Sequence, residues 1–120
     1  MAVQRKILVV DDDANVREML SYQLRNAGYE VADAASGEVA IDLLRHDSYD
    51  LVLLDLIMPG KPGVEVLREI QAMNPFQWCI VISGLADVWQ KREPEIRPYA
   101  VVQKPIDFPR LASLIEAAFR

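Results

Sequence analysis

The stretch LVLLDLIMPG, residues 51–60, ends an apolar run with a single carboxylate, Asp55, and then breaks the chain with Pro59 and Gly60. The run before Asp55 is continuously apolar rather than alternating, which is typical of a strand covered on both faces. Burying an isolated charge at the end of such a strand is costly, so Asp55 should have polar partners. These partners must come from other parts of the chain.

Four other short apolar runs also predict strands. They lie at residues 6–11, 30–35, 78–83 and 100–104, and the strand that ends in Asp55 spans 50–55. Helical patterns lie between the strands, so strand and helix alternate along the chain. This alternation predicts an α/β fold with a doubly wound, five-stranded parallel sheet, right-handed crossovers and helices on both faces. We expect the flavodoxin-like strand order 2-1-3-4-5.

Short polar side chains mark where the expected helices begin. Asp13, Ser36 and Asp107 each precede a helical pattern and are expected N-caps. The segment between the fourth and fifth strands differs, because it contains Pro94 and Pro98. Proline interrupts helical hydrogen bonding, so we expect only an irregular fourth helix there.

Composition limits the class of protein. The chain has 120 residues, of which 52% are hydrophobic, so we expect one packed domain over residues 1–120. A net charge of −5 argues against direct binding of nucleic acid. The single cysteine, Cys79, cannot form an internal disulfide, which fits a reducing compartment, and we expect the cytoplasm. The N-terminus predicts neither a signal peptide nor a membrane span.

Polar groups end four of the five expected strands. The carboxyl ends of parallel strands meet at one edge of a sheet, where binding sites form. These groups are Asp11, Asp12 and Asp13 after the first strand, Asp55 at the end of the third, Ser83 and Gly84 at the fourth, and Lys104 and Pro105 at the fifth. Crowded carboxylates raise a pKa or recruit a cation, and a site of oxygen ligands suits Mg²⁺ or Mn²⁺.

The remaining groups at this edge suit a phosphoryl group. Lys104 supplies a positive charge and Ser83 supplies a hydroxyl. Gly84 has no Cβ, so its backbone N–H can be approached closely. With a divalent ion these groups would cradle a phosphoryl group, and one carboxylate could attack it to form an acyl phosphate.

Four motifs carry a resemblance to a known family over essentially the whole chain. In chain order they are ILVVDDD, LVLLDLIMPGKPG, VISG and QKP. The chain resembles the receiver domain of two-component response regulators, close to the single-domain chemotaxis type. The resemblance implies a phosphorylation-dependent signalling switch that receives phosphate from a histidine kinase or a phosphotransfer protein and acts on a downstream protein. It implies no catalysis beyond the protein's own phosphorylation and dephosphorylation, and no contact with a membrane.

The resemblance also implies a metal site. Asp11 and Asp12 would form the acidic pair, with Asp12 a direct Mg²⁺ ligand and Asp11 often acting through water. The backbone carbonyl of Ile57 would be a further ligand, beside Asp55. Adjacent residues of a strand point to opposite faces, so Asp11 and Asp12 can share a site only if the strand has begun to turn there.

The same resemblance assigns the groups that handle phosphate. Asp55 would be the phosphoacceptor, Ser83 would hold the family's hydroxyl position, and Lys104 would pair with the phosphoryl group. The peptide bond between Lys104 and Pro105 is often cis in this family, which proline permits at low cost.

Three alternatives can be weighed against this interpretation. A phosphate-independent interaction module is suggested by Val101, which occupies a position where receivers often carry Tyr or Phe, but the full set of site residues argues against it. An aspartate-based phosphohydrolase needs a second carboxylate two residues after the nucleophile, where this chain has Ile57. A flavin domain would place phosphate after the first strand, where Asp11, Asp12 and Asp13 would repel it.

Overall fold

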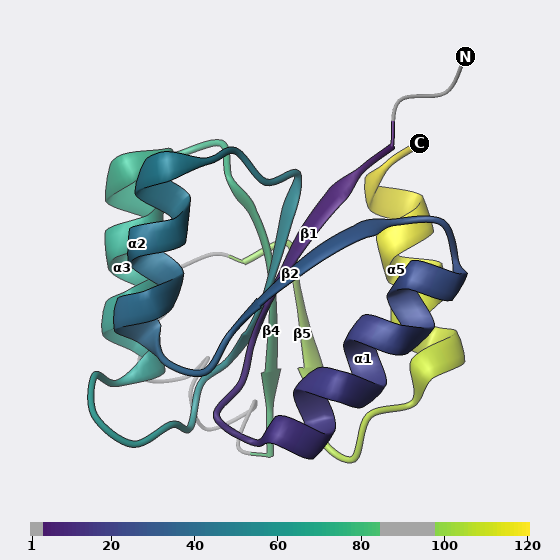
Figure 1. Cartoon of the computed structure of the whole chain (residues 1–120), viewed down its shortest axis with the longest axis horizontal. Coiled ribbons are helices and arrows are strands. Elements are labelled where there is room, and N and C mark those ends of the chain that lie inside the picture. Colours follow the sequence, from purple (N-terminus) through teal and green to yellow (C-terminus); the bar gives the residue numbers. More distant parts are fainter. Residues whose placement is uncertain (1–3, 85–97) are drawn as a thin grey trace.

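Five parallel strands form one sheet, in the order β2-β1-β3-β4-β5, in the computed structural model, which describes residues 4–84 and 98–120. The strands are β1 (Lys6–Val10), β2 (Glu30–Ala34), β3 (Leu51–Asp55), β4 (Trp78–Ser83) and β5 (Ala100–Gln103). The described helices are α1 (Ala14–Asn26), α2 (Gly37–His46), α3 (Gly63–Met73) and α5 (Phe108–Ala118). Helices α1 and α5 cover one face of the sheet, and α2 and α3 cover the other (Figure 1).

The predicted fold class and strand order are therefore confirmed. The expected N-caps are also found, because Asp13, Ser36 and Asp107 each accept hydrogen bonds from backbone N–H groups at the start of a helix. The expected irregular fourth helix concerns residues 85–97, which lie outside the described residues. No helix in the described ranges is both long enough and apolar enough to cross a membrane.

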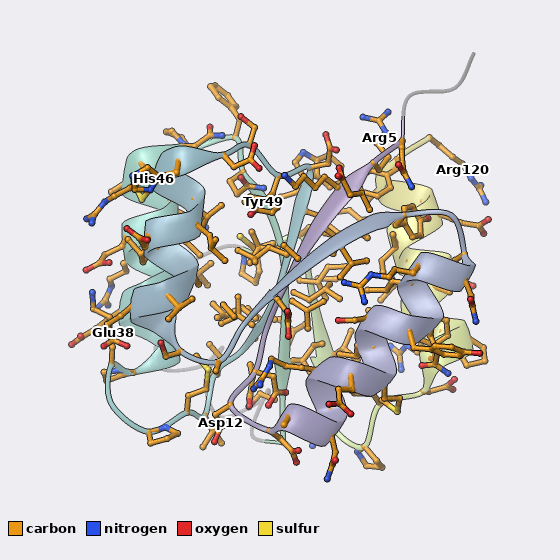
Figure 2. All side chains as sticks on the ribbon, in the orientation of Figure 1. Arg5, Asp12, Glu38, His46, Tyr49 and Arg120 are labelled. Atoms are coloured by element: carbon orange, nitrogen blue, oxygen red, sulfur yellow. The ribbon has the colours of Figure 1, made fainter. Side chains whose placement is uncertain are left out.

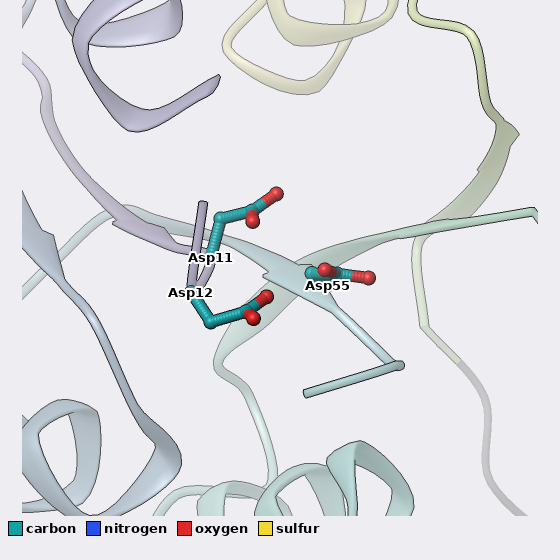
Figure 3. Close-up of side chains that lie close together, drawn as sticks. All are labelled: Asp11, Asp12 and Asp55. Carbon is teal, nitrogen blue, oxygen red and sulfur yellow. The ribbon is translucent and has the colours of Figure 1, made fainter. Parts of the chain in front are cut away.

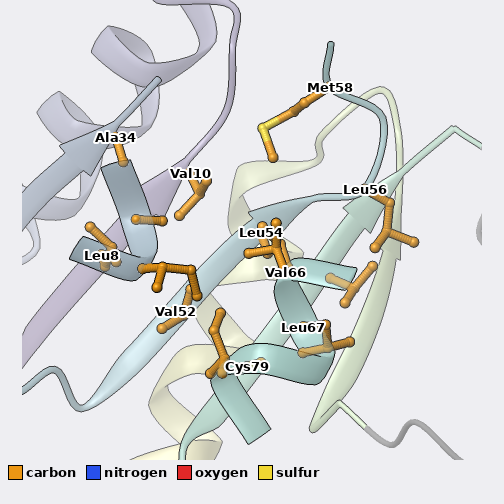
Figure 4. Close-up of a cluster of buried hydrophobic side chains, with 14 of the residues drawn as sticks. Leu8, Val10, Ala34, Val52, Leu54, Leu56, Met58, Val66, Leu67 and Cys79 are labelled. Atoms are coloured by element: carbon orange, nitrogen blue, oxygen red, sulfur yellow. The ribbon is translucent and has the colours of Figure 1, made fainter. Parts of the chain in front are cut away.

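The sheet has an apolar core on each face, which explains why its central strands are apolar at nearly every position. Alternate residues of β1 and β3 pack against α2 and α3 on one side (Figure 4) and against α1 and α5 on the other. Burial of each such Val or Leu side chain stabilises the folded state by about 1.5–3 kcal/mol. Cys79 belongs to the core beside α2 and α3, and burial raises the pKa of its thiol to about 12, so it packs as a neutral side chain.

Strand register brings the polar groups to one edge. In the pairing of β1 with β3, Val10 lies opposite Leu54, and in each case the next residue along the chain is an aspartate, Asp11 or Asp55. In the pairing of β3 with β4, Asp55 lies opposite Ile82, and Ser83 is the next residue of β4. In the pairing of β4 with β5, Ser83 lies opposite Gln103, and Lys104 directly follows it. The central strands therefore fix the position of the candidate site.

A close backbone contact holds the loop that follows β3. The N–H of Gly63, the first residue of α3, donates a hydrogen bond to the carbonyl of Leu56 at 3.2 Å. A Cβ on Gly63 would lie 2.4 Å from the Leu56 Cα and 2.5 Å from its carbonyl oxygen. Only glycine allows this approach, and Leu56 directly follows Asp55.

We predict that Gly63→Ala destabilises the protein by about 1–3 kcal/mol, the usual cost of overpacking, because backbone atoms must move apart. Denaturant unfolding monitored by circular dichroism measures the difference. Ala72→Ser is the control, since it adds one atom at an exposed position of the same helix and should change stability by less than about 0.5 kcal/mol. Equal stability of Gly63→Ala and wild type would show that the loop relaxes freely.

Candidate functional site

Three carboxylates gather at the carboxyl ends of β1 and β3 (Figure 3). One oxygen from each of Asp11, Asp12 and Asp55 lies within 4.8 Å of the others. Asp11 and Asp55 are only 3% and 4% exposed, whereas Asp12 is exposed. Three oxygen donors at this spacing, two of them buried, fit a hard divalent cation, which would also relieve their mutual repulsion.

Lys104 lies next to this cluster. Its Nζ is 3.2 Å from Asp55 Oδ2 and 3.5 Å from Asp11 Oδ2. The backbone N–H of Lys104 donates to the carbonyl of Ser83 at 3.1 Å, which ties the end of β5 to that of β4. The bond between Lys104 and Pro105 is cis, as the family resemblance implies.

The environment of Asp55 disfavours its charge. Burial raises the pKa of Asp55 above its ordinary value, and the hydrogen bond from the Ile57 N–H, at 3.1 Å, acts against this shift. Asp11 raises this pKa further, while Lys104 lowers it, and the net shift is upward. Burial also lowers the pKa of Lys104, but attraction to Asp55 and Asp11 outweighs it, so Lys104 stays an ammonium group.

The turn after β1 explains how adjacent aspartates reach one site. The strand ends at Val10, and the N–H of Asp11 still donates to the carbonyl of Ala34 at 3.2 Å. Asp11 Oδ1 then accepts a hydrogen bond from the N–H of Asp13 at 2.9 Å. The chain has therefore left the strand geometry that would send the side chains of Asp11 and Asp12 to opposite faces.

The other expected site residues lie at the same edge. Ser83 ends β4 and is buried, and Gly84 follows it in an exposed turn, where its carbonyl accepts a hydrogen bond from the Gln103 side chain at 2.8 Å. A Cβ on Gly84 would meet no atom of the described residues within 4 Å. The Ile57 side chain is 56% exposed beside Asp55. Val101 packs partly buried against the core beside α2 and α3.

Sequence reasoning missed Arg17. Its Nη1 donates to the backbone carbonyl of Asp11 at 2.8 Å, and its Nε pairs with Asp33 Oδ2 at 3.1 Å. The available signal was a cation near the N-terminus of α1, where the helix dipole does not favour positive charge.

A hollow of about 320 Å³ lies at the opposite end of the sheet from the acidic cluster. Arg5, Tyr49 and Trp78 are among the residues that line it, and Figure 2 shows Arg5 and Tyr49 far from Asp12. The hollow contains none of the three aspartates. The acidic cluster is thus separate from this hollow.

Comparison with known proteins places this arrangement in one family. Residues 7–116 match the family described as the response regulator receiver domain. The structure is similar to a CheY-like receiver domain protein from Methanospirillum hungatei, with a TM-score of 0.90, 25% identity, and 96% and 93% of the two chains covered.

Two further neighbours are described with a beryllofluoride group. One is the response regulator TrrA from Thermotoga maritima in complex with Mg²⁺ and BeF, with a TM-score of 0.88, 32% identity, and 96% and 99% of the two chains covered. The other is the BeF3-activated receiver domain of DrrB, with a TM-score of 0.87, 26% identity and 98% of each chain covered.

The chain therefore belongs to the response regulator receiver domain family. It is a receiver domain of the two-component type, a signalling switch whose own chemistry is autophosphorylation at most. Receiver domains of response regulators interact with histidine kinases or phosphotransfer proteins.

We predict that Asp55→Asn stabilises the metal-free protein at neutral pH, because it removes a charge that burial disfavours. A carboxyl group whose pKa is raised by folding stabilises the folded state at pH values below its pKa in the unfolded chain. This stabilisation is lost as the pH rises through its pKa in the folded protein. The melting temperature of the variant should exceed that of wild type by a few degrees at pH 7 in EDTA, and the gap should close towards pH 4.

Glu65→Gln is the control for this experiment, because it neutralises an exposed carboxylate of α3 and should give no such gain. A melting temperature of Asp55→Asn below that of wild type at pH 7 would show that Lys104 outweighs burial at Asp55.

Proposed function

We propose that this domain accepts a phosphoryl group on Asp55 from a histidine kinase or a phosphotransfer protein, with Mg²⁺, or alternatively Mn²⁺, as cofactor. The observation that carries the proposal is the setting of Asp55. A buried carboxylate at the sheet edge lies 3.2 Å from the ammonium of Lys104 and within 4.8 Å of two further carboxylates. Such a charge arrangement suits transfer of a small, highly charged group.

We assign the metal to Asp11, Asp12, Asp55 and the backbone carbonyl of Ile57. A bound divalent ion supplies positive charge that offsets the carboxylates and the incoming phosphoryl oxygens. The Asp12 carboxylate makes no hydrogen bond or ion pair within the described part of the chain, so it is available as a direct ligand. Both oxygens of Asp11 are already engaged, by the Asp13 N–H and by Lys104, which favours contact through water.

Asp55 would act as the nucleophile. A carboxylate oxygen of Asp55 forms a bond to phosphorus while the bond between phosphorus and the donor's imidazole nitrogen breaks, and the imidazole keeps that electron pair. Lys104 then pairs with the phosphoryl oxygens in place of the Asp55 charge. The Ser83 hydroxyl and the Gly84 N–H would donate hydrogen bonds to the same oxygens, in line with their place at the sheet edge.

We assign residues 1–120 to one domain that works in the cytoplasm and passes its signal to a downstream protein. Its net charge of −5 supports action through proteins rather than direct contact with nucleic acid. A phosphate-independent interaction module is the alternative, and a phosphorylation assay separates the two.

Incubation with acetyl phosphate and Mg²⁺ should add the mass of one phosphoryl group, measured by intact mass spectrometry. Asp55→Asn should remove this adduct, and excess EDTA should suppress it in wild type. Asp42→Asn, an exposed aspartate of α2, is the control and should be labelled normally. Equal labelling of Asp55→Asn and wild type, or full labelling in EDTA, would refute the proposal.

The phosphorylated state should be long-lived, because the exposed Ile57 side chain beside Asp55 offers no hydrogen bond to an attacking water. We expect Ile57→Asn to lose its phosphoryl group several-fold faster than wild type after removal of the donor, since an amide can orient water. Ile57→Val keeps the position apolar and should decay like wild type. An unchanged decay rate in Ile57→Asn would show that Ile57 does not set the lifetime.

A further inference from the structure

We propose that Arg17 is a positioning residue for the metal site: by holding the backbone carbonyl of Asp11, it turns the chain so that Asp12 faces Asp55. This inference rests on the proposed function, because it concerns the same cluster of three carboxylates. It adds a group on α1 that touches neither the metal nor the phosphoryl group.

The guanidinium of Arg17 bridges two elements. Nη1 donates to the carbonyl oxygen of Asp11 at 2.8 Å, and Nε pairs with Asp33 Oδ2 of β2 at 3.1 Å. The Arg17 side chain is only 18% exposed. Guanidinium is planar and rigid, so anchoring one nitrogen on β2 fixes the direction of the other. The carbonyl of Asp11 is thereby held towards α1.

The position of that carbonyl bears directly on Asp12. The carbonyl of Asp11 and the N–H of Asp12 belong to one planar peptide unit. In a continuing strand this carbonyl would take part in the ladder of the sheet, and adjacent side chains would diverge. Here it bonds to Arg17, and both side chains lie on the side of Asp55 (Figure 3).

Of the other bonds of Asp11, the one from the Asp13 N–H to Oδ1 also spans Asp12 and fixes the peptide that follows it. The N–H of Asp11 donates to Ala34, Oδ1 accepts from the Asp13 N–H, and Oδ2 lies 3.5 Å from Lys104. The bonds to Ala34 and Lys104 locate Asp11 itself. Because the Asp12 carboxylate has no polar partner within the described residues, the two peptides that flank Asp12 control where that carboxylate lies, and Arg17 holds the preceding one.

The ion pair with Asp33 does not by itself explain an arginine at this place. Arg17 lies near the N-terminus of α1, where the helix dipole disfavours a cation. Its partner Asp33 is 47% exposed, and ion pairs open to solvent contribute little to folding. A role at the metal site accounts for both features.

The test is the affinity of the purified protein for Mg²⁺, measured by NMR titration of backbone amides with MgCl₂ in the absence of phosphate donor. Arg17→Met keeps the aliphatic stem and loses the donors. We expect its dissociation constant to rise about 10-fold, the lower range for loss of a group that supports metal ligands. The metal-free melting temperature should fall by a few degrees only, because the carbonyl of Asp11 loses its donor while the protein stays folded.

The direction of the change in Mg²⁺ affinity distinguishes a positioning role of Arg17 from a purely electrostatic effect of its charge. Removing a positive charge near a cation site would tighten Mg²⁺ binding by electrostatics alone. Weaker binding by Arg17→Met therefore reports lost geometry. Arg17→Lys should fall between Arg17→Met and wild type, because one ammonium cannot reproduce the two directions of the guanidinium fork.

Arg25→Met is the matched control. Arg25 lies on the same helix, and its Nη2 donates to the backbone carbonyl of Val31 in β2 at 3.1 Å, away from the acidic cluster. This variant should bind Mg²⁺ like wild type. Equal weakening in Arg25→Met and Arg17→Met would overturn the proposal, because it would indicate a general effect on α1.

Two further outcomes are decisive. Wild-type affinity in Arg17→Met would overturn the positioning role and leave the metal site intact, whereas no Mg²⁺ binding by wild type would overturn the metal site itself. If Arg17→Met does not fold, Arg17→Gln replaces it, since its shorter amide cannot span both partners. Wild-type affinity in Arg17→Gln would then overturn the positioning role.

Discussion

The crowding of like charges at one sheet edge is the constraint on which this structure depends. Two of the three carboxylates are buried, and each unit of negative charge there raises the cost of the next. Lys104 offsets part of that cost from the end of β5. The remaining free-energy cost is offset by the packing of the strands beneath the site, which are covered on both faces. The remaining repulsion between the carboxylates is what a cation bound at this edge would relieve.

Much of the fold follows from local patterns in the sequence. The apolar runs predict all five strands, and those of β1, β3 and β4 are nearly continuous because both faces of the sheet are covered there. Asp13, Ser36 and Asp107 mark helix starts because short side chains can bond to free N–H groups. The grouping of polar residues follows from a general property of parallel sheets. The carboxyl ends of parallel strands lie at the same edge whatever the order of the strands in the sheet.

Other parts of the site depend on contacts that no local pattern contains. The spacing of Asp11 and Asp12 argued against a shared site, because the sequence does not show that β1 ends at Val10. The bridge from Arg17 to Asp33 joins a helix to a strand that follows it, and both residues look like ordinary surface charges in the sequence. The close approach of Gly63 to Leu56 is likewise visible only when the loop is seen against α3.

The pairing of Lys104 with Asp11 joins residues that are 93 positions apart in the chain. The site is assembled from the ends of four strands, so no isolated segment of the chain contains it. Opening of β5 alone would remove the ammonium group and leave the carboxylates unbalanced. The site therefore exists only while these four strands stay paired, so local opening of the sheet at β5 would abolish it before the domain unfolds as a whole.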